Sequence, residues 1–169
     1  MNLDLDGTKL ALPEHRERLQ AWLAGERIAP ITMDLALTQK CSMSCAYCFG
    51  KLQQNPSDPV ECETWSQFLD DCVTIGHKPG AGVKGISLVS DGESTMSKSY
   101  YKFIAKAKEL GIDVASGTNG LALKQEQMPM LLSALTYLRI NISAAEPEVY
   151  AKVMGTTITA YEHVIGNIM

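Results

Sequence analysis

Short apolar runs alternate with amphipathic stretches through most of this 169-residue chain. Four of the runs have the apolar, β-branched composition of buried strands, and they cover residues 31–38, 83–90, 112–118 and 137–143. Each run is followed by a segment with helical signals. This order predicts an α/β fold of four βα units, in which right-handed helical crossovers join parallel strands.

Start and stop residues mark the helices that connect these strands. Asp58, Pro59 and Glu61 have the order of a helix start, and Gly76 is a stop, so a helix is expected from residue 59 to residue 75. Its apolar positions recur three and four apart and predict a stripe that faces the core: Cys62, Trp65, Phe68, Leu69, Cys72 and Val73. Further helices are expected at residues 98–110, 121–135, 147–154 and 159–169.

Residues 1–30 are expected to form an N-terminal extension with one helix, and residues 31–169 the core domain. Proline at the first position and Gly25 as a stop predict that this helix covers residues 13–24. Its apolar side, with Leu19, Trp22 and Leu23, is expected to pack on the flank of the fold. Recognition of a partner by this helix is the functional alternative.

The composition indicates one ordinary globular domain, with 46% apolar and 20% charged residues. The net charge of −4, with no cluster of Lys or Arg, argues against a nucleic-acid partner or an anionic membrane surface. No apolar run approaches the roughly 20 residues of a membrane helix. The five cysteines are an odd number, which suits reduced thiols and a cytoplasmic location.

Three cysteines in one short loop, Cys41, Cys45 and Cys48, are the clearest candidates for chemistry. Their spacing allows three thiolates to converge on one metal centre. A structural zinc ion requires four ligands and no fourth cysteine is nearby, whereas three ligands fit an iron–sulfur cluster with one iron left open. Cys62 and Cys72 are expected to be packed thiols, with a role in a second cluster as the alternative.

The cysteine loop resembles the signature of the radical S-adenosylmethionine (radical SAM) family, C-x3-C-x-aromatic-C after the first barrel strand. Here it reads Cys41, Cys45, Tyr47 and Cys48. The resemblance implies a [4Fe-4S] cluster on the three cysteines, SAM as the second cofactor, and Tyr47 beside the adenine. It also implies a partial (βα) barrel of parallel strands, of which this chain supplies about four units. Family cores usually have six units, so a missing C-terminal segment or a partner is expected to complete the barrel, with an unusually short family member as the alternative.

The turn after the second predicted strand is similar to the family's Gly-Gly-Glu-Pro motif, which holds the amino group of SAM. Gly92 and Glu93 match the second glycine and the glutamate, whereas Asp91 and Ser94 depart from the motif. The resemblance therefore implies that Glu93 and the neighbouring backbone bind the SAM amino group. The alternative is that Asp91 and Glu93 only cap the following helix.

Two more strand ends resemble family segments at the mouth of the active site. Thr118 and Asn119 belong to a Thr-Asn-Gly sequence that lines this mouth after the third strand. Asn141 and Ser143 follow the fourth strand, where the family places a polar residue on the SAM ribose. Tight backbone geometry at Gly120 and a helix cap at Ser143 are the alternatives.

The function implied by the resemblance is reductive cleavage of SAM to a 5′-deoxyadenosyl radical, which abstracts hydrogen from a substrate. The order of the motifs most resembles family members that modify peptides and proteins. The implied partners are a small-molecule or peptide substrate and a reductant such as flavodoxin or ferredoxin; the sequence assigns no catalytic residue. An iron–sulfur electron-transfer protein with Cys62 as fourth ligand is one alternative. A zinc-binding module that uses the three cysteines and His77 is another.

Overall fold

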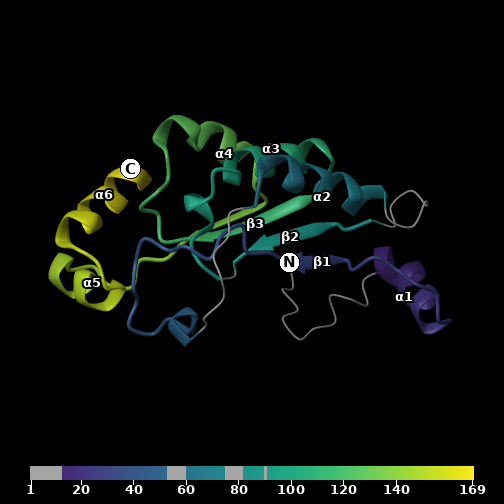
Figure 1. Cartoon of the computed structure of the whole chain (residues 1–169), viewed down its shortest axis with the longest axis horizontal. Coiled ribbons are helices and arrows are strands. Elements are labelled where there is room, and N and C mark those ends of the chain that lie inside the picture. Colours follow the sequence, from purple (N-terminus) through teal and green to yellow (C-terminus); the bar gives the residue numbers. More distant parts are fainter. Residues whose placement is uncertain (1–12, 53–59, 75–81, 90) are drawn as a thin grey trace.

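The computed structural model describes residues 13–52, 60–74, 82–89 and 91–169. Within these residues a parallel sheet forms the centre of the molecule, and its strands follow one another across the sheet in chain order (Figure 1). The strands are β1 (Thr32–Asp34), β2 (Gly85–Leu88), β3 (Asp113–Thr118) and β4 (Tyr137–Ile140). The prediction of an α/β fold with four parallel strands is confirmed.

Helices cover one face of the sheet and flank both of its ends (Figure 1). The face is covered by α2 (Cys62–Thr74), α3 (Tyr100–Glu109) and α4 (Met128–Ala134). At the carboxyl ends of the strands lie α5 (Pro147–Met154) and α6 (Ile158–Ile168), whereas α1 (Arg16–Leu23) lies at the opposite end. Short 3₁₀ turns are η2 (Pro13–His15), η3 (Phe49–Leu52), η4 (Ser94–Met96) and η5 (Gln125–Gln127). None of the described helices has the length and apolar composition needed to cross a bilayer.

The main hydrophobic core lies between the sheet and the three covering helices. Its most deeply buried side chains come from α2, the strands, α3 and α4: Leu69, Ile86, Leu88, Tyr100, Ile104, Val114 and Leu131. The stripe predicted on α2 does face this core, because Leu69 and Cys72 are buried and Trp65, Phe68 and Val73 pack partly buried against it. Each fully buried aliphatic side chain stabilises the fold by roughly 1.5–3 kcal/mol.

A second, smaller core joins the cysteine loop to the last two helices. Met43 of the loop packs with Tyr150 and Met154 of α5 and with Val164 of α6, and all four are buried. The loop is therefore anchored at its centre by a residue between Cys41 and Cys45. This anchoring fixes the loop against the α5–α6 hairpin, far along the chain.

All four strands are shorter than predicted: β2 covers residues 85–88 rather than 83–90, with residue 90 outside the described part, and β3 begins one residue late. The differences at β1 and β4 have a clear structural reason, because the chain leaves the sheet there while its side chains make other contacts. β1 ends at Asp34, although Leu35 still donates its N–H to the Ser87 carbonyl oxygen (2.9 Å) and Leu37 is buried in the main core. β4 ends at Ile140, and the Asn141 N–H donates to the Thr118 carbonyl oxygen (2.8 Å) before the chain leaves the sheet. The prediction of a strand to residue 143 is wrong for this reason.

The starts of two helices also differ from the prediction. α2 begins at Cys62, and the Glu61 carbonyl oxygen accepts the Trp65 N–H (3.2 Å), so Glu61 stands just before the helix; residues 58, 59 and 75 lie outside the described part of the chain. α4 begins at Met128 rather than residue 121. The preceding N–H groups bind side chains instead, since Leu121 donates to Asn119 Oδ1 (3.0 Å) and Lys124 to the Tyr101 hydroxyl (2.9 Å).

The last two predicted helices lie close to where they were expected. α5 has the predicted bounds. α6 begins one residue earlier than predicted, because the Thr157 side chain caps it and accepts the Ala160 N–H (3.2 Å). The helix predicted at residues 98–110 is α3, which starts at Tyr100 after the η4 turn.

The N-terminal helix is present, but the prediction that its apolar side packs on the fold is wrong. No residue of α1 is buried, and Trp22 and Leu23 are 58% and 77% exposed. The helix is attached through Arg18 instead, whose guanidinium donates to the carbonyl oxygens of Gly82 (2.8 Å) and Pro30 (3.3 Å).

Candidate functional site

The residues singled out in the sequence follow the carboxyl ends of all four strands, at one edge of the sheet. The cysteine loop follows β1, Gly92 and Glu93 follow β2, and Asn119 follows β3. Asn141 and Ser143 follow β4. Because the strands are parallel, these four segments meet at the same edge, which is where α/β folds place their sites.

The cysteine loop carries three free thiols on an irregular backbone. Cys41 and Cys48 are exposed and Cys45 is half-buried. The Cys48 N–H donates to the Cys45 carbonyl oxygen (3.1 Å), which turns the end of the loop back on itself. In the described part of the chain, no three His, Cys, Asp or Glu side chains are placed to hold one metal ion. A [4Fe-4S] cluster takes its cysteine ligands on separate irons, so its ligands do not have to meet at one atom.

The electrostatics of Cys41 link the loop to the glutamate turn. Desolvation raises the pKa of this thiol above its ordinary value, and the negative charges of Glu93, Cys45 and Cys48 raise it further. A hydrogen bond with the Met43 backbone acts in the opposite direction. Ionisation of Cys41 is therefore disfavoured in the metal-free protein, and a cationic metal centre bound to this thiol would favour it.

Glu93 is a buried carboxylate held by four hydrogen bonds, and it is only 3% exposed. Its Oε1 accepts from the hydroxyls of Thr95 (2.6 Å) and Thr118 (2.7 Å) and from the Thr95 N–H (3.2 Å). Its Oε2 accepts from the Asn119 N–H (2.7 Å). The bond from the Thr95 N–H also makes Glu93 the cap of η4, so the capping interpretation describes part of its contacts.

The turn that carries Glu93 is joined to the backbone that leads into the cysteines. Gly92 has φ +70°, and a side chain there would collide with the Thr38 carbonyl oxygen and the Gln39 backbone. The Glu93 N–H donates to the Lys40 carbonyl oxygen (2.8 Å), directly before Cys41. Glycine at this position therefore allows the two backbones to touch.

Asn119 connects the glutamate to the cysteine loop through its side chain. While its N–H binds Glu93, its Nδ2 donates to Ser42 Oγ (3.1 Å) and lies 3.8 Å from the Cys41 sulfur. Thr118 donates to Glu93 and accepts the Gly120 N–H (3.0 Å). The turn after β2, the end of β3 and the cysteine loop thus belong to one hydrogen-bonded network.

A second network joins Tyr47 to the end of β4. The Tyr47 hydroxyl lies 2.6 Å from Ser143 Oγ, and Asn141 Nδ2 donates to the same hydroxyl (2.8 Å) and to Ser143 Oγ (3.2 Å). All three residues are exposed, which keeps their polar groups accessible to a ligand. The structure therefore brings together the residues predicted for the adenine and the ribose.

The remaining cysteines lie elsewhere. Cys72 is 2% exposed in the main core, as predicted for a packed thiol. The Cys62 sulfur lies 3.1 Å from Ser99 Oγ, at the start of α3. His77, the fourth ligand of the zinc alternative, lies outside the described residues.

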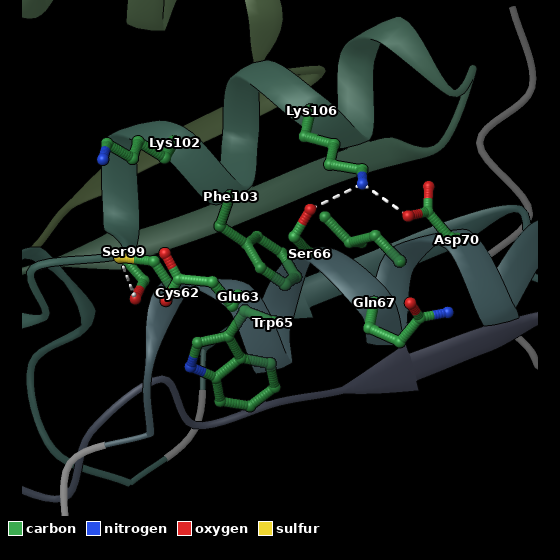
Figure 2. Close-up of a pocket in the computed structure, with 11 residues that line it drawn as sticks. Cys62, Glu63, Trp65, Ser66, Gln67, Asp70, Ser99, Lys102, Phe103 and Lys106 are labelled. Atoms are coloured by element: carbon green, nitrogen blue, oxygen red, sulfur yellow. Dashed lines mark hydrogen bonds and ion pairs between the residues drawn. The ribbon is translucent and has the colours of Figure 1, made fainter.

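A pocket of about 410 Å³ lies between α2 and α3, on the helical layer rather than at the edge that carries the site (Figure 2). It is lined by Cys62, Ser99 and Lys102 at one end and by an ion pair between Lys106 and Asp70 (2.6 Å) at the other. The cysteine loop and the Gly92–Glu93 turn contribute none of its described lining residues. The pocket is therefore separate from the candidate site.

Two residues of the site were not identified from the sequence. Thr95 donates twice to Glu93, and its position two residues after the glutamate is the only possible signal. The Met154 sulfur accepts from the Tyr47 hydroxyl (3.3 Å) and lies 3.8 Å from the Cys45 sulfur. A methionine inside a helix is an ordinary core residue in sequence, so no local signal identifies Met154.

Comparisons with known proteins show which family this chain belongs to. A family model described as the Radical SAM superfamily matches residues 35–168. A probable GTP 3′,8-cyclase of Thermococcus kodakarensis is 27% identical over 131 residues, which are 75% of this chain and 39% of that protein. A PqqA peptide cyclase of Rhodopseudomonas palustris is 25% identical over 128 residues, which are 75% of this chain and 32% of that protein.

Solved structures with the same fold include SuiB of Streptococcus suis. SuiB bound to S-adenosylmethionine superposes with a TM-score of 0.66 at 18% identity, over 97% of this chain and 37% of SuiB. SuiB bound to its precursor peptide SuiA gives a TM-score of 0.65 at 15% identity. The chain thus spans well under half the length of these relatives and structures.

Proposed function

Because the chain belongs to the radical SAM superfamily, whose members use a [4Fe-4S] cluster and S-adenosylmethionine, we propose that it cleaves S-adenosylmethionine reductively and removes hydrogen from a substrate. The observation that supports this most is the bonding of Glu93 to Asn119, which also reaches the cysteine loop. Through Asn119, the cysteine loop proposed for the cluster and the carboxylate proposed for SAM belong to one hydrogen-bonded network at one edge of the sheet.

In this proposal Cys41, Cys45 and Cys48 hold the cluster. Their donor set fits it, because three thiols on one loop leave an iron free for a second ligand. Held by these three cysteines and reduced, such a cluster would supply the electron for reductive cleavage of SAM to the 5′-deoxyadenosyl radical. The protein's own part is to keep the thiols on one loop and to position SAM beside them.

Glu93 is proposed to bind the amino group of SAM, together with the backbone at Gly92. The carboxylate is buried, and within the described residues no Lys or Arg forms an ion pair with it in place of a ligand cation. Its Oε2 accepts a single hydrogen bond, from Asn119, so a second acceptor position remains. A buried carboxylate with a free acceptor position suits an ammonium group.

Tyr47, Asn141 and Ser143 are proposed to contact the adenine and ribose, and Thr118 and Asn119 to shape the mouth of the site. The exposed hydroxyls of Tyr47 and Ser143, 2.6 Å apart, can turn toward the hydroxyls of a sugar. Asn119 and Thr118 are buried, and they act on SAM by holding Glu93 in place.

We propose a peptide or small-molecule substrate and a reductant such as flavodoxin or ferredoxin. A peptide substrate is supported by the PqqA peptide cyclase and by SuiB in complex with SuiA, and a small molecule by the GTP 3′,8-cyclase. The thiols have to remain reduced for metal binding, which supports a cytoplasmic location.

Electron paramagnetic resonance of the anaerobically reconstituted, reduced protein tests this function. A [4Fe-4S] signal that shifts when S-adenosylmethionine is added is the expected result. A cluster whose signal is unchanged by S-adenosylmethionine contradicts the enzyme proposal and favours electron transfer. Absence of iron, with zinc bound instead, contradicts the cluster itself.

The Cys45→Ala variant tests the ligand assignment, with Cys72→Ala as the control because that thiol is buried in the core away from the loop. Cys45→Ala should lose the cluster signal and most of its iron, whereas Cys72→Ala should retain both. A Cys45→Ala protein with its full iron content and spectrum rules out Cys45 as a ligand.

A further inference from the structure

The carboxyl end of α5 contacts the cysteine loop through its backbone. Ser44 donates its N–H to the Met154 carbonyl oxygen (3.1 Å), and Ala46 donates to the Val153 carbonyl oxygen (2.9 Å). The last carbonyl groups of a helix have no partner inside the helix. In α5 two of them accept from the residues on either side of Cys45.

Gly155 is what lets the loop approach this helix end. It ends α5 with φ +60°, in the left-handed region, and its N–H donates to the Ala151 carbonyl oxygen. A side chain at this position would collide with the backbone of Ser44, at the carbonyl oxygen and carbon. Because the obstacle is backbone, the loop itself would have to move.

The Met154 side chain continues the same contact toward the thiols. It is fully buried, and its sulfur lies 3.8 Å from the Cys45 sulfur and 3.3 Å from the Tyr47 hydroxyl. Tyr47 in turn contacts Ser143 and Asn141. One side chain of α5 therefore touches both the loop and the aromatic residue that reaches the end of β4.

We propose that Met154 and Gly155 are positioning residues, which hold the cysteine loop in the conformation that receives the cluster. This inference rests on the proposed function in one respect, which is that the group bound by the loop is taken to be the iron–sulfur cluster. The support itself consists of two backbone hydrogen bonds, one close backbone approach and one thioether contact. Figure 1 shows the α5–α6 hairpin beside the blue segment that carries the loop.

Gly155→Ala is the direct test, and Gly111→Ala is its matched control. Both glycines follow a helix and have positive φ, +60° and +70°, so alanine strains the backbone similarly at the two positions. A side chain at Gly111 would meet nothing within 4 Å, whereas one at Gly155 collides with Ser44. The difference between the two variants therefore isolates the contact with the loop.

The readout is amide hydrogen exchange at Ser44 and Ala46 in the metal-free protein. Both residues are exposed, so their N–H bonds to α5 are the visible source of protection. Loss of these bonds in Gly155→Ala should speed exchange by about ten- to a hundredfold relative to Gly111→Ala. Equal exchange in the two variants overturns the proposal.

A second pair of variants covers the case in which Gly155→Ala does not fold. Met154→Leu keeps an apolar side chain of similar size but removes the sulfur acceptor. Met130→Leu makes the same change at a partly buried residue that packs against the main core, away from the cysteine loop. After anaerobic reconstitution, Met154→Leu should show an altered cluster signal or a lower iron content, with Met130→Leu unchanged. Identical signals and iron contents in both variants overturn the role of the thioether.

The two levels of the proposal fail in different ways. If the wild-type protein takes up no iron, the proposed function fails, while the exchange experiment still decides whether α5 holds the loop. If the cluster forms and exchange at Ser44 and Ala46 is indifferent to Gly155→Ala, the function stands and the positioning role is wrong.

Discussion

Replacing Glu93 by glutamine tests the network at the centre of the site, since the change keeps the shape of the side chain and removes its charge. The carboxylate accepts from four donors, and a glutamine has only one oxygen with which to accept. If that oxygen takes the position with three donors, the amide NH₂ faces the Asn119 N–H. Two donors then point at each other inside the protein.

The cost can be worked from these contacts. An unsatisfied buried N–H at Asn119 costs about 1–3 kcal/mol, and three hydrogen bonds that change from a charged to a neutral acceptor weaken by about 0.5 kcal/mol each. Removing a buried charge relieves part of its desolvation and offsets some of this loss. We therefore expect Glu93→Gln to lower the free energy of unfolding by about 2 kcal/mol.

Urea denaturation of the metal-free protein, followed by circular dichroism, measures this change. The control is Glu162→Gln, which makes the same substitution on the exposed side of α6 and should change stability by less than about 0.5 kcal/mol. In the reconstituted enzyme, Glu93→Gln should also weaken S-adenosylmethionine binding by about tenfold or more, through loss of a charge-assisted bond. A Glu93→Gln protein as stable as the Glu162→Gln control refutes the reasoning about the network.

Three further predictions concern the fold. Burial raises the pKa of Tyr100 to about 12 from 10.0. The contribution of the neutral hydroxyl to the free energy of unfolding is therefore complete below pH 10 and declines by about 2–3 kcal/mol as the pH rises toward 12. The urea midpoints measured at pH 9 and at pH 11.5 should differ less in Tyr100→Phe than in the wild-type protein. Lys106→Met should lower the free energy of unfolding by less than about 1 kcal/mol, and by still less in 1 M salt, because Lys106 and Asp70 are partly exposed. A larger loss in urea denaturation that does not depend on salt contradicts this prediction. Gly92→Ala should destabilise by about 2 kcal/mol or more, because its side chain collides with the Thr38 backbone; a calorimetric melting temperature equal to wild type contradicts the close approach.

The sequence was most informative where local chemistry decides the outcome. The apolar, β-branched runs predict the four strands, and the helix predicted from Pro147 to Met154 is α5. The strand ends predict which segments meet, because parallel strands all finish at one edge. These features are set by a few neighbouring residues.

The contacts between distant segments could not be predicted in this way. Nothing local distinguishes Met154 from a core methionine, and its partner Tyr47 lies 107 residues earlier. Likewise, the apolar side of α1 reads as a packing face, yet the helix is attached by the guanidinium of Arg18 to Gly82, 64 residues away. Such contacts depend on which surfaces the fold brings together, and a periodic pattern does not contain that information.

The dependence of the cysteine loop on α5 also has a consequence during protein synthesis. Cys45 emerges from the ribosome 109 residues before Met154, the residue that supports it. At about 5–20 residues per second, the three thiols wait roughly 5–20 s for their support. During that interval the loop lacks its contacts with α5, and its free thiols can be oxidised or can bind another metal ion. Insertion of the correct metal group is therefore expected to follow translation of α5 rather than to accompany translation of the loop.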